Sequence, residues 1–139
     1  MQNIILLFMK ERENMGIIQK FKCPSCEMSW EVFLGHGMGH ALIEDVLDVF
    51  PSDIRQKILA DTQGEQFPAF EFNFRPAVCW HCRKVVSIPV IDLPQSGHTY
   101  FPNCPECGTS VSVRQEDEEL ICPHCGKSAL SAEAAGRWD

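Results

Sequence analysis

Residues 104–126 read CPECGTSVSVRQEDEELICPHCG, and this stretch decides the fold. Two C-x-x-C pairs flank a loop, and each has Pro after its first cysteine and Gly after its second. That composition is typical of a zinc knuckle, a tight turn that directs two thiolates at one metal ion. Val111 and Val113 alternate with polar residues as in a half-buried strand, and residues 115–119 suit an exposed hairpin tip. The stretch therefore predicts a zinc ribbon over residues 98–128.

All eight cysteines of the 139-residue chain fall into C-x-x-C pairs. Because only 14 residues separate the last two pairs, we expect these two to share one metal site. The first two pairs, 52 residues apart, then form the second site by elimination, although two other pairings of four knuckles remain open. Glu27 and Arg83 stand where knuckles usually have Gly, and Trp80 stands where Pro is usual. The expected metal ligands are Cys23, Cys26, Cys79, Cys82, Cys104, Cys107, Cys122 and Cys125.

Four thiolates in a closed tetrahedral site favour zinc, so we expect two structural Zn²⁺ ions. Iron, as in a rubredoxin-type centre, is the alternative for the C-terminal site. A disulfide framework fits less well because no export signal is visible. A thioredoxin-like redox motif would need one such pair before a helix rather than four pairs among strands.

Short strands are expected on both sides of the first two pairs. Residues 17–22 and 28–33 flank the first pair, and residues 85–91 follow the second, with Pro89 marking an edge or a bulge. Residues 67–74 precede the second pair. Their phenylalanines recur at every second position, which predicts a strand with one aromatic face packed with Trp30, Phe33 and the helices: Phe70, Phe72 and Phe74.

Between these strands the apolar spacing predicts a helical hairpin. Residues 41–50 form one amphipathic helix that Pro51 ends. Residues 52–63 form the second, with Ser52 as its N-cap and Gly64 beyond its end.

The fold class predicted is therefore a small, metal-stabilised α+β protein of two zinc ribbons, the first with a helical insertion. Its expected parts are an N-terminal appendage (1–14), a first module (15–93) with its insertion (35–66), a linker (94–97), the second ribbon (98–128), and a tail (129–139) whose Trp138 folds back.

The glycine-rich stretch GHGMGH, residues 35–40, permits three interpretations. A phosphate-binding loop would need Lys and Ser or Thr after the final glycine, and His40 and Ala41 stand there instead. A metal-binding pair of His36 and His40 would require helical glycines, each costing about 1 kcal/mol relative to Ala. The stretch is therefore interpreted as a strand-to-helix turn. The remaining histidines, His81, His98 and His124, complete no catalytic motif.

The net charge argues against nucleic-acid binding, and the hydropathy argues against a membrane-spanning segment. The formal net charge is −7, and eight thiolates with two divalent ions would make it about −11, which disfavours nucleic acid as a ligand. The apolar run at residues 4–9 is too short to cross a bilayer, and it is followed at once by charged residues rather than by a cleavage site. We therefore expect a cytoplasmic protein with no membrane contact.

The segments FKCPSCEMSWEVF (21–33) and PSDIRQKILADTQGEQFPAFEFNFRPAVCWHC (51–82) resemble the bacterial CpXC family and related tandem zinc-ribbon proteins. In that family a C-P-x-C knuckle opens the domain and a helical insertion precedes a second knuckle. The resemblance covers most of residues 17–130, and CWHC departs from the family's C-P-x-C-G pattern. It implies the fold and the zinc, and it supplies no activity.

The function expected from the sequence is that of a non-enzymatic zinc protein that acts as a protein-interaction or adaptor module. A nucleic-acid-binding transcriptional regulator is the first alternative, because Arg75, Arg83 and Lys84 lie near the second knuckle. A metal-handling or electron-transfer protein with a rubredoxin-like iron site is the second.

Overall fold

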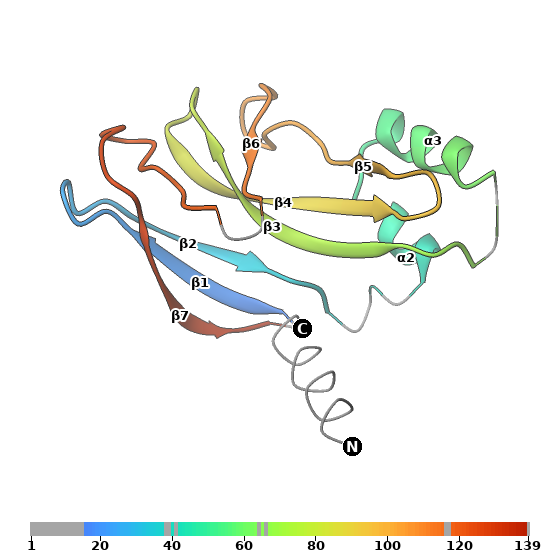
Figure 1. Cartoon of the computed structure of the whole chain (residues 1–139), viewed down its shortest axis with the longest axis horizontal. Coiled ribbons are helices and arrows are strands. Elements are labelled where there is room, and N and C mark those ends of the chain that lie inside the picture. Colours follow the sequence, from blue (N-terminus) through green and yellow to red (C-terminus); the bar gives the residue numbers. More distant parts are fainter. Residues whose placement is uncertain are drawn as a thin grey trace, which may run out of the picture.

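The computed structural model describes residues 16–37, 40, 42–63, 65, 67–115 and 118–138. In these residues, short antiparallel strands form two sheets, and two helices lie together at one end of the molecule (Figure 1). The predicted class, a small α+β protein with few helices, is confirmed at this level. The predicted appendage, residues 1–14, lies outside the described residues, as do Met38, Gly39 and Gly64.

The first sheet has the strand order β2-β1-β7. Its strands β1 (Ile17–Lys22) and β2 (Ser29–Leu34) form an antiparallel hairpin whose turn contains the first C-x-x-C pair. The strands predicted at 17–22 and 28–33 are confirmed to within a residue. The third strand, β7 (Ser131–Arg137), pairs with β1 but lies in the predicted tail, where no strand was expected.

The second sheet has the order β5-β4-β3-β6. Here β3 (Glu71–Cys79) and β4 (Lys84–Leu93) form a second antiparallel hairpin, and its turn contains the second C-x-x-C pair. The short strands β5 (His98–Tyr100) and β6 (Ser112–Val113) lie at the two edges. The strand predicted around Val113 is therefore confirmed, but it pairs with β3 rather than with a strand of its own ribbon.

A backbone bridge and an apolar cluster join the two sheets. Gly35 donates to the Phe74 carbonyl at 2.8 Å and accepts from the Phe74 N–H at 2.7 Å, so the end of β2 is bonded to β3. The cluster takes buried side chains from both sheets and from the segment before β7: Phe21, Val32, Leu34, Val78, Val85 and Leu120. Burial of these side chains holds the two hairpins together.

The helices are shorter than predicted. They are α2 (Ile43–Leu47) and α3 (Ser52–Asp61), and the N-cap of α3 is Pro51 rather than Ser52. Arg55 supports the connection between them by donating to the carbonyls of Leu47 and Phe50 at 3.2 and 3.1 Å. Both helices cover the aromatic face of β3, as expected, in a cluster of Val46, Leu47, Phe50, Ile58, Phe72, Phe74, Ile91 and Leu93.

Trp138 folds back onto the body of the protein, as predicted. Its indole Nε1 donates to the Leu34 carbonyl at 2.8 Å, and its ring lies edge-on to Phe33 and Phe74 at centroid distances of 5.6 and 5.8 Å. Phe33, predicted as a core residue, keeps 44% of its surface exposed. Trp30 is partly buried and packs in the cluster between the sheets instead of against the helices.

Candidate metal centre

All four C-x-x-C pairs adopt the same tight turn. In each, the carbonyl of the first cysteine accepts a hydrogen bond of 2.8–3.0 Å from the N–H four residues later. That later residue has a positive φ in every turn, which is why Gly is usual there. Two of the turns use a residue with a side chain, and the four positions with their φ angles are Glu27 (64°), Arg83 (59°), Gly108 (76°) and Gly126 (70°).

The four turns combine in a crossed order. One group contains Cys23, Cys26, Cys122 and Cys125, and the other contains Cys79, Cys82, Cys104 and Cys107. In each group the four Sγ atoms lie within 4.8 Å of one another. All eight predicted ligands are therefore gathered into two sets of four. The predicted pairing is wrong: the third pair joins the second, and the fourth joins the first.

The antiparallel pairing of β7 with β1 accounts for this order. Its register places Ser131 opposite Lys22, which directly precedes Cys23. The fourth knuckle ends just before β7, so it is brought against the first knuckle, where the hydroxyls of Ser25 and Ser128 are hydrogen-bonded. Each cysteine group thus takes one pair from each of the two predicted modules, and the division at residues 94–97 stays a prediction.

The sulfur separations fit a tetrahedral ion. Zinc–sulfur bonds of about 2.3 Å in a tetrahedron place neighbouring sulfurs ~3.8 Å apart. In the first group the distances Cys23–Cys125 and Cys26–Cys122 are both 3.7 Å. In the second group, Cys79–Cys107 and Cys82–Cys104 are 3.4 and 3.9 Å. In both groups, all four ligand positions of a tetrahedral ion can be filled by protein sulfur.

Two cysteines in each group have a lowered pKa, and the shift is largest at Cys107 and Cys125. The Thr109 hydroxyl and N–H lower the pKa of Cys107 to about 5. The N–H groups of Lys127 and Ser128 lower the pKa of Cys125 to about 6. Thiolates are the metal-binding form of cysteine. In the same groups, burial and the neighbouring thiols raise the pKa of Cys26 and of Cys82 to about 12, so the cysteines of one group differ in how readily they ionise. Thr109 was not singled out from the sequence, because its role depends on the fold of the knuckle.

N–H groups within the turns also point at sulfur. The N–H groups of Cys26 and Cys82 lie 3.4 Å from the Sγ atoms of Cys23 and Cys79. Such bonds orient a ligand sulfur and reduce the charge it presents. Their presence supports a structural role for both groups.

His36 and His40 have hydrogen-bond partners outside the cysteine groups. Nδ1 of His36 is 2.9 Å from Oδ1 of Asn73, while Nδ1 of His40 accepts the Gly37 N–H at 3.0 Å. The His40 ring packs on Phe72 with centroids 4.8 Å apart. Nδ1 of each histidine thus has a hydrogen-bond partner within the protein, which is compatible with the interpretation of this stretch as a turn. The described part of the chain has no cluster of three or more potential ligands that includes a histidine.

His98 belongs to a different cluster, which the sequence analysis did not identify. Oδ2 of Asp61, at the end of α3, accepts from Ser96 Oγ at 3.0 Å, His98 Nδ1 at 2.8 Å and the Tyr100 hydroxyl at 2.8 Å. These bonds, that from His98 foremost, lower the pKa of Asp61. These hydrogen bonds connect the end of α3 to β5. His81 and His124 are exposed within their knuckles, as expected of residues that fill a turn.

No helix among residues 16–37, 42–63, 67–115 and 118–138 combines the length and the apolar character that a bilayer crossing requires. No family model, curated protein sequence or solved structure matches this chain.

Proposed function

We propose that this chain is a structural zinc protein that binds another protein and carries out no catalysis. The observation that carries the proposal is the composition of the two cysteine groups. Each group consists of four cysteines from two separate segments of the chain. Four cysteine sulfurs complete the coordination of a structural zinc ion. A catalytic zinc site would keep one position for water or substrate.

The two sets of four cysteines would hold one Zn²⁺ each, and each ion would supply a cross-link between two knuckles. Elemental analysis of purified protein should give two zinc ions per chain. Structural zinc contributes roughly 10–16 kcal/mol in zinc-finger peptides, so a strong chelator should abolish most of the folded circular-dichroism signal. Full retention of that signal after verified metal removal would contradict a structural role.

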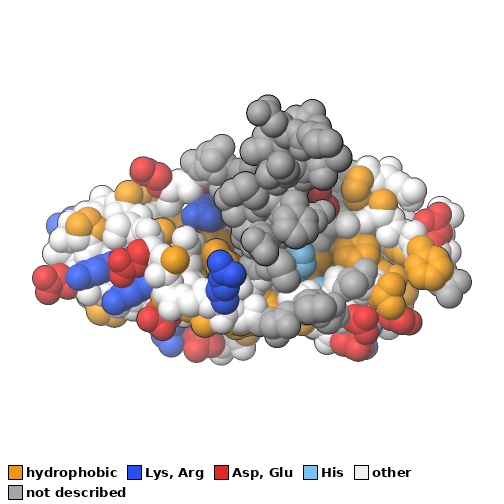
Figure 2. Space-filling model, turned by 90° about the horizontal axis from the view of Figure 1, so that it is seen from below, with side chains coloured by type: hydrophobic (Ala, Val, Ile, Leu, Met, Phe, Trp, Pro, Cys, Tyr) orange, Lys and Arg blue, Asp and Glu red, His pale blue; other side chains and the backbone are white. Residues whose placement is uncertain are grey.

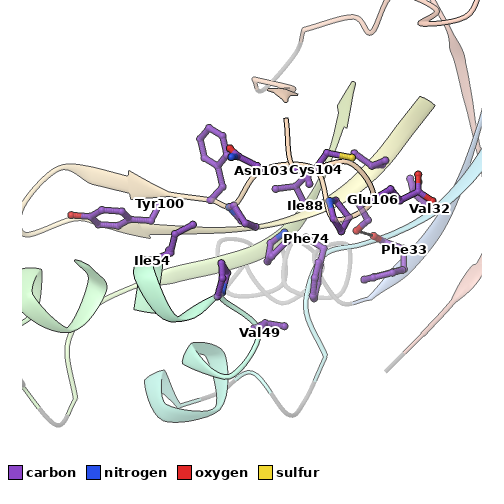
Figure 3. Close-up of a pocket in the computed structure, with 18 of the residues that line it drawn as sticks. Val32, Phe33, Val49, Ile54, Phe74, Ile88, Tyr100, Asn103, Cys104 and Glu106 are labelled. Atoms are coloured by element: carbon purple, nitrogen blue, oxygen red, sulfur yellow. Dashed lines mark hydrogen bonds between the residues drawn. The ribbon is translucent and has the colours of Figure 1, made fainter. Parts of the chain in front are cut away.

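The surface best suited to a partner is a groove of about 1050 Å³. It lies between β2, the helices and the segment 99–108, and β4 forms its floor (Figure 3). Phe33 and Phe101 line it with 44% and 40% of their surfaces exposed. Exposed aromatic side chains in a concave, largely apolar surface are characteristic of protein-binding sites.

The groove also borders a strand edge that the described residues pair only in part. The outer edge of β4 pairs with β5 only over residues 91–93. Both backbone groups of Phe74 bond to Gly35, so its cross-strand neighbour Pro89 also directs its carbonyl away from β3. By the same alternation Ser87 and Val85 present their N–H and C=O groups to the outer edge. A partner segment in extended conformation could add there as a further strand.

Affinity capture with two matched variants tests the partner role. Phe101→Asp places a charge in the groove, whereas Phe67→Asp places the same charge on an exposed residue that does not line it. The wild type and Phe67→Asp should recover the same stoichiometric protein, and Phe101→Asp should lose it. Equal recovery by all three would exclude this groove, and recovery of no stoichiometric protein under several conditions would contradict the partner role.

Nucleic acid stays the first alternative. Figure 2 shows Lys and Arg side chains at the end of the first sheet, but they alternate there with Asp and Glu rather than forming a continuous basic surface. With a net charge of −7 before any metal is bound, binding to the phosphate backbone of a nucleic acid is disfavoured. Micromolar binding to a duplex at physiological salt, weakening steeply as salt rises, would favour this alternative.

An iron site stays the second alternative, but the crossed pairing changes which cysteines would hold the iron. The predicted C-terminal site of Cys104, Cys107, Cys122 and Cys125 is not formed, so iron would have to occupy one of the two observed groups. Visible absorption together with elemental analysis of protein purified without oxidation separates iron from zinc.

A further inference from the structure

A polar cavity lies between β1 and the edge of β3, away from the cysteine groups. Its volume is about 430 Å³. Gln19 of β1 lines it, although its neighbours on the same strand face, Ile17 and Phe21, are apolar and pack in the cluster between the sheets. Arg75, Arg114 and Gln115 line it from the other side. Two arginines and a glutamine thus line the same cavity.

The two arginines are held next to each other. Nη2 of Arg75 donates a hydrogen bond to the carbonyl of Arg114. The guanidinium of Arg114 lies over the Phe21 ring, 5.9 Å from its centroid. Burial, and then the positive charge of Arg75, lower the pKa of Arg114. Both guanidinium groups are thus fixed in place, one through its neighbour's backbone and the other through an aromatic ring.

Neither arginine forms an ion pair within the described ranges of the chain. Two like charges at close range oppose each other, and this chain has 19 acidic residues against 12 basic ones from which to supply partners. Each guanidinium has five N–H donors in a planar fork that matches carboxylate and phosphate oxygens. Donors remain available on both, because the hydrogen bond of Arg75 uses only one of its nitrogens.

Acidic side chains lie at the other end of the cavity. Glu71 and Asp92 also line the cavity and lie opposite each other in the β3–β4 register. Glu71 is four residues before Arg75, so about 13 Å separates the two positions along β3. The negative charge of Glu118 acts in the opposite direction, toward a higher pKa of Arg114, so this carboxylate lies on the same side as that arginine. An anionic group would therefore fit at the arginine end, and a long polyanion would not.

We propose that Arg75, Arg114 and Gln19 bind a single oxyanion, the carboxylate or phosphate group of a small molecule. Arg75 and Arg114 would donate to its oxygens, and the Gln19 amide would complete the contacts. The site includes no cysteine, and it shares only Phe74 with the proposed partner groove. The cavity that would hold this oxyanion is lined by both arginines and by Gln19.

Side-chain NMR on the zinc-loaded chain tests the site directly. The Nε–Hε signals of the arginines are followed while inorganic phosphate or acetate is added at constant ionic strength. We expect saturable shifts at Arg75 and Arg114 and only small shifts at the exposed Arg83. Stronger binding of one probe identifies the source as phosphate or carboxylate. Shifts at Arg75 and Arg114 no larger than those at Arg83 with both probes would overturn the proposal.

Variants provide the second measurement. Arg75→Gln and Arg114→Gln should each weaken binding of the better probe about tenfold, the effect of losing one charge-assisted hydrogen bond. Lys57→Gln removes the same charge from α3 and should leave the affinity unchanged. If Arg114→Gln does not fold, Gln19→Leu serves in its place, because it keeps both arginines and removes the amide. Equal affinities for Arg75→Gln and Lys57→Gln would show that general charge, and not this site, attracts the anion.

Discussion

Nη2 of Arg83 donates a hydrogen bond of 3.0 Å to the carbonyl of His124. Arg83 ends the second knuckle and His124 lies inside the fourth, so this bond connects the two cysteine groups. The same arginine closes its own turn, because its N–H donates to the Cys79 carbonyl at 2.8 Å. One residue therefore forms hydrogen bonds to a turn of each cysteine group.

Loss of this connection should make metal release less concerted. Arg83→Gln removes the bond to His124, and we expect a loss of about 0.5–1 kcal/mol in the free energy of unfolding, since the bond is exposed. Zinc release to a colorimetric chelator should change from one phase to two. Lys84→Gln, which breaks an ion pair with Glu106 inside a single group, is the control and should keep one phase. Identical release curves for both variants would show that the groups are not coupled through Arg83.

Paired cysteine substitutions distinguish the crossed pairing from the sequential one. Cys26→Ser with Cys125→Ser removes two ligands of one group, so native mass spectrometry should detect one zinc ion per chain. Cys26→Ser with Cys82→Ser removes one ligand from each group and should weaken both sites, leaving less than one ion per chain under mild chelation. The sequential pairing predicts the opposite pattern, so an exchange of the two results would refute the structure's pairing.

Glu27 holds a φ of 64°, in the left-handed region that glycine adopts without steric cost. Glu27→Gly should therefore raise the free energy of unfolding of the zinc-loaded protein by about 0.5–1 kcal/mol, as measured in urea. Glu31→Gly is the matched control, because Glu31 lies within β2, where glycine costs about 0.5–1 kcal/mol. A Glu27→Gly variant less stable than the wild type would mean that the Glu27 side chain contributes more than the backbone strain costs.

His40 should make the protein less stable in mild acid. Burial, and then the nearby His36, lower the pKa of His40, so its neutral form is favoured in the folded state. A pKa that is lower in the folded than in the unfolded chain gives stability that is present above the unfolded value, near 6.5, and lost as pH falls through the folded value. His40→Gln should therefore reduce the drop in melting temperature between pH 7 and pH 5. An unchanged drop would assign the acid sensitivity to other groups.

The four cysteine turns and the strand before Cys79 could be predicted from the sequence. C-x-x-C followed by a left-handed position specifies a knuckle whatever lies around it, so all eight ligands and the four turns were expected. The alternating phenylalanines before Cys79 predicted a strand at residues 67–74 on which the helices pack, whereas the observed β3 begins at Glu71 and continues to Cys79. Both patterns are complete within about ten residues, which is the range over which sequence patterns are informative.

The pairing of the knuckles could not be predicted, because it depends on β7. Residues 131–137 read SAEAAGR, a composition with low β-propensity, and all seven are exposed. What holds this strand is its backbone pairing with β1 and the neighbouring cluster that contains Leu120 and Leu130. The short loop between the last two C-x-x-C pairs favoured a shared site for them. The long-range contacts of β7 bring the fourth pair to the first instead. The proximity of Arg75 and Arg114 also depends on the pairing of β6 with β3.

The crossed order also sets a sequence of events during synthesis. Cys79 and Cys107 are 28 positions apart, whereas Cys23 and Cys125 are 102 apart. The group with the shorter span is complete in the emerging chain first, and its closure costs about 1 kcal/mol less chain entropy. Cys23 and Cys26 are made earliest and completed last. Until then they are a free dithiol, open to oxidation or to binding any thiol-seeking metal ion in the surroundings.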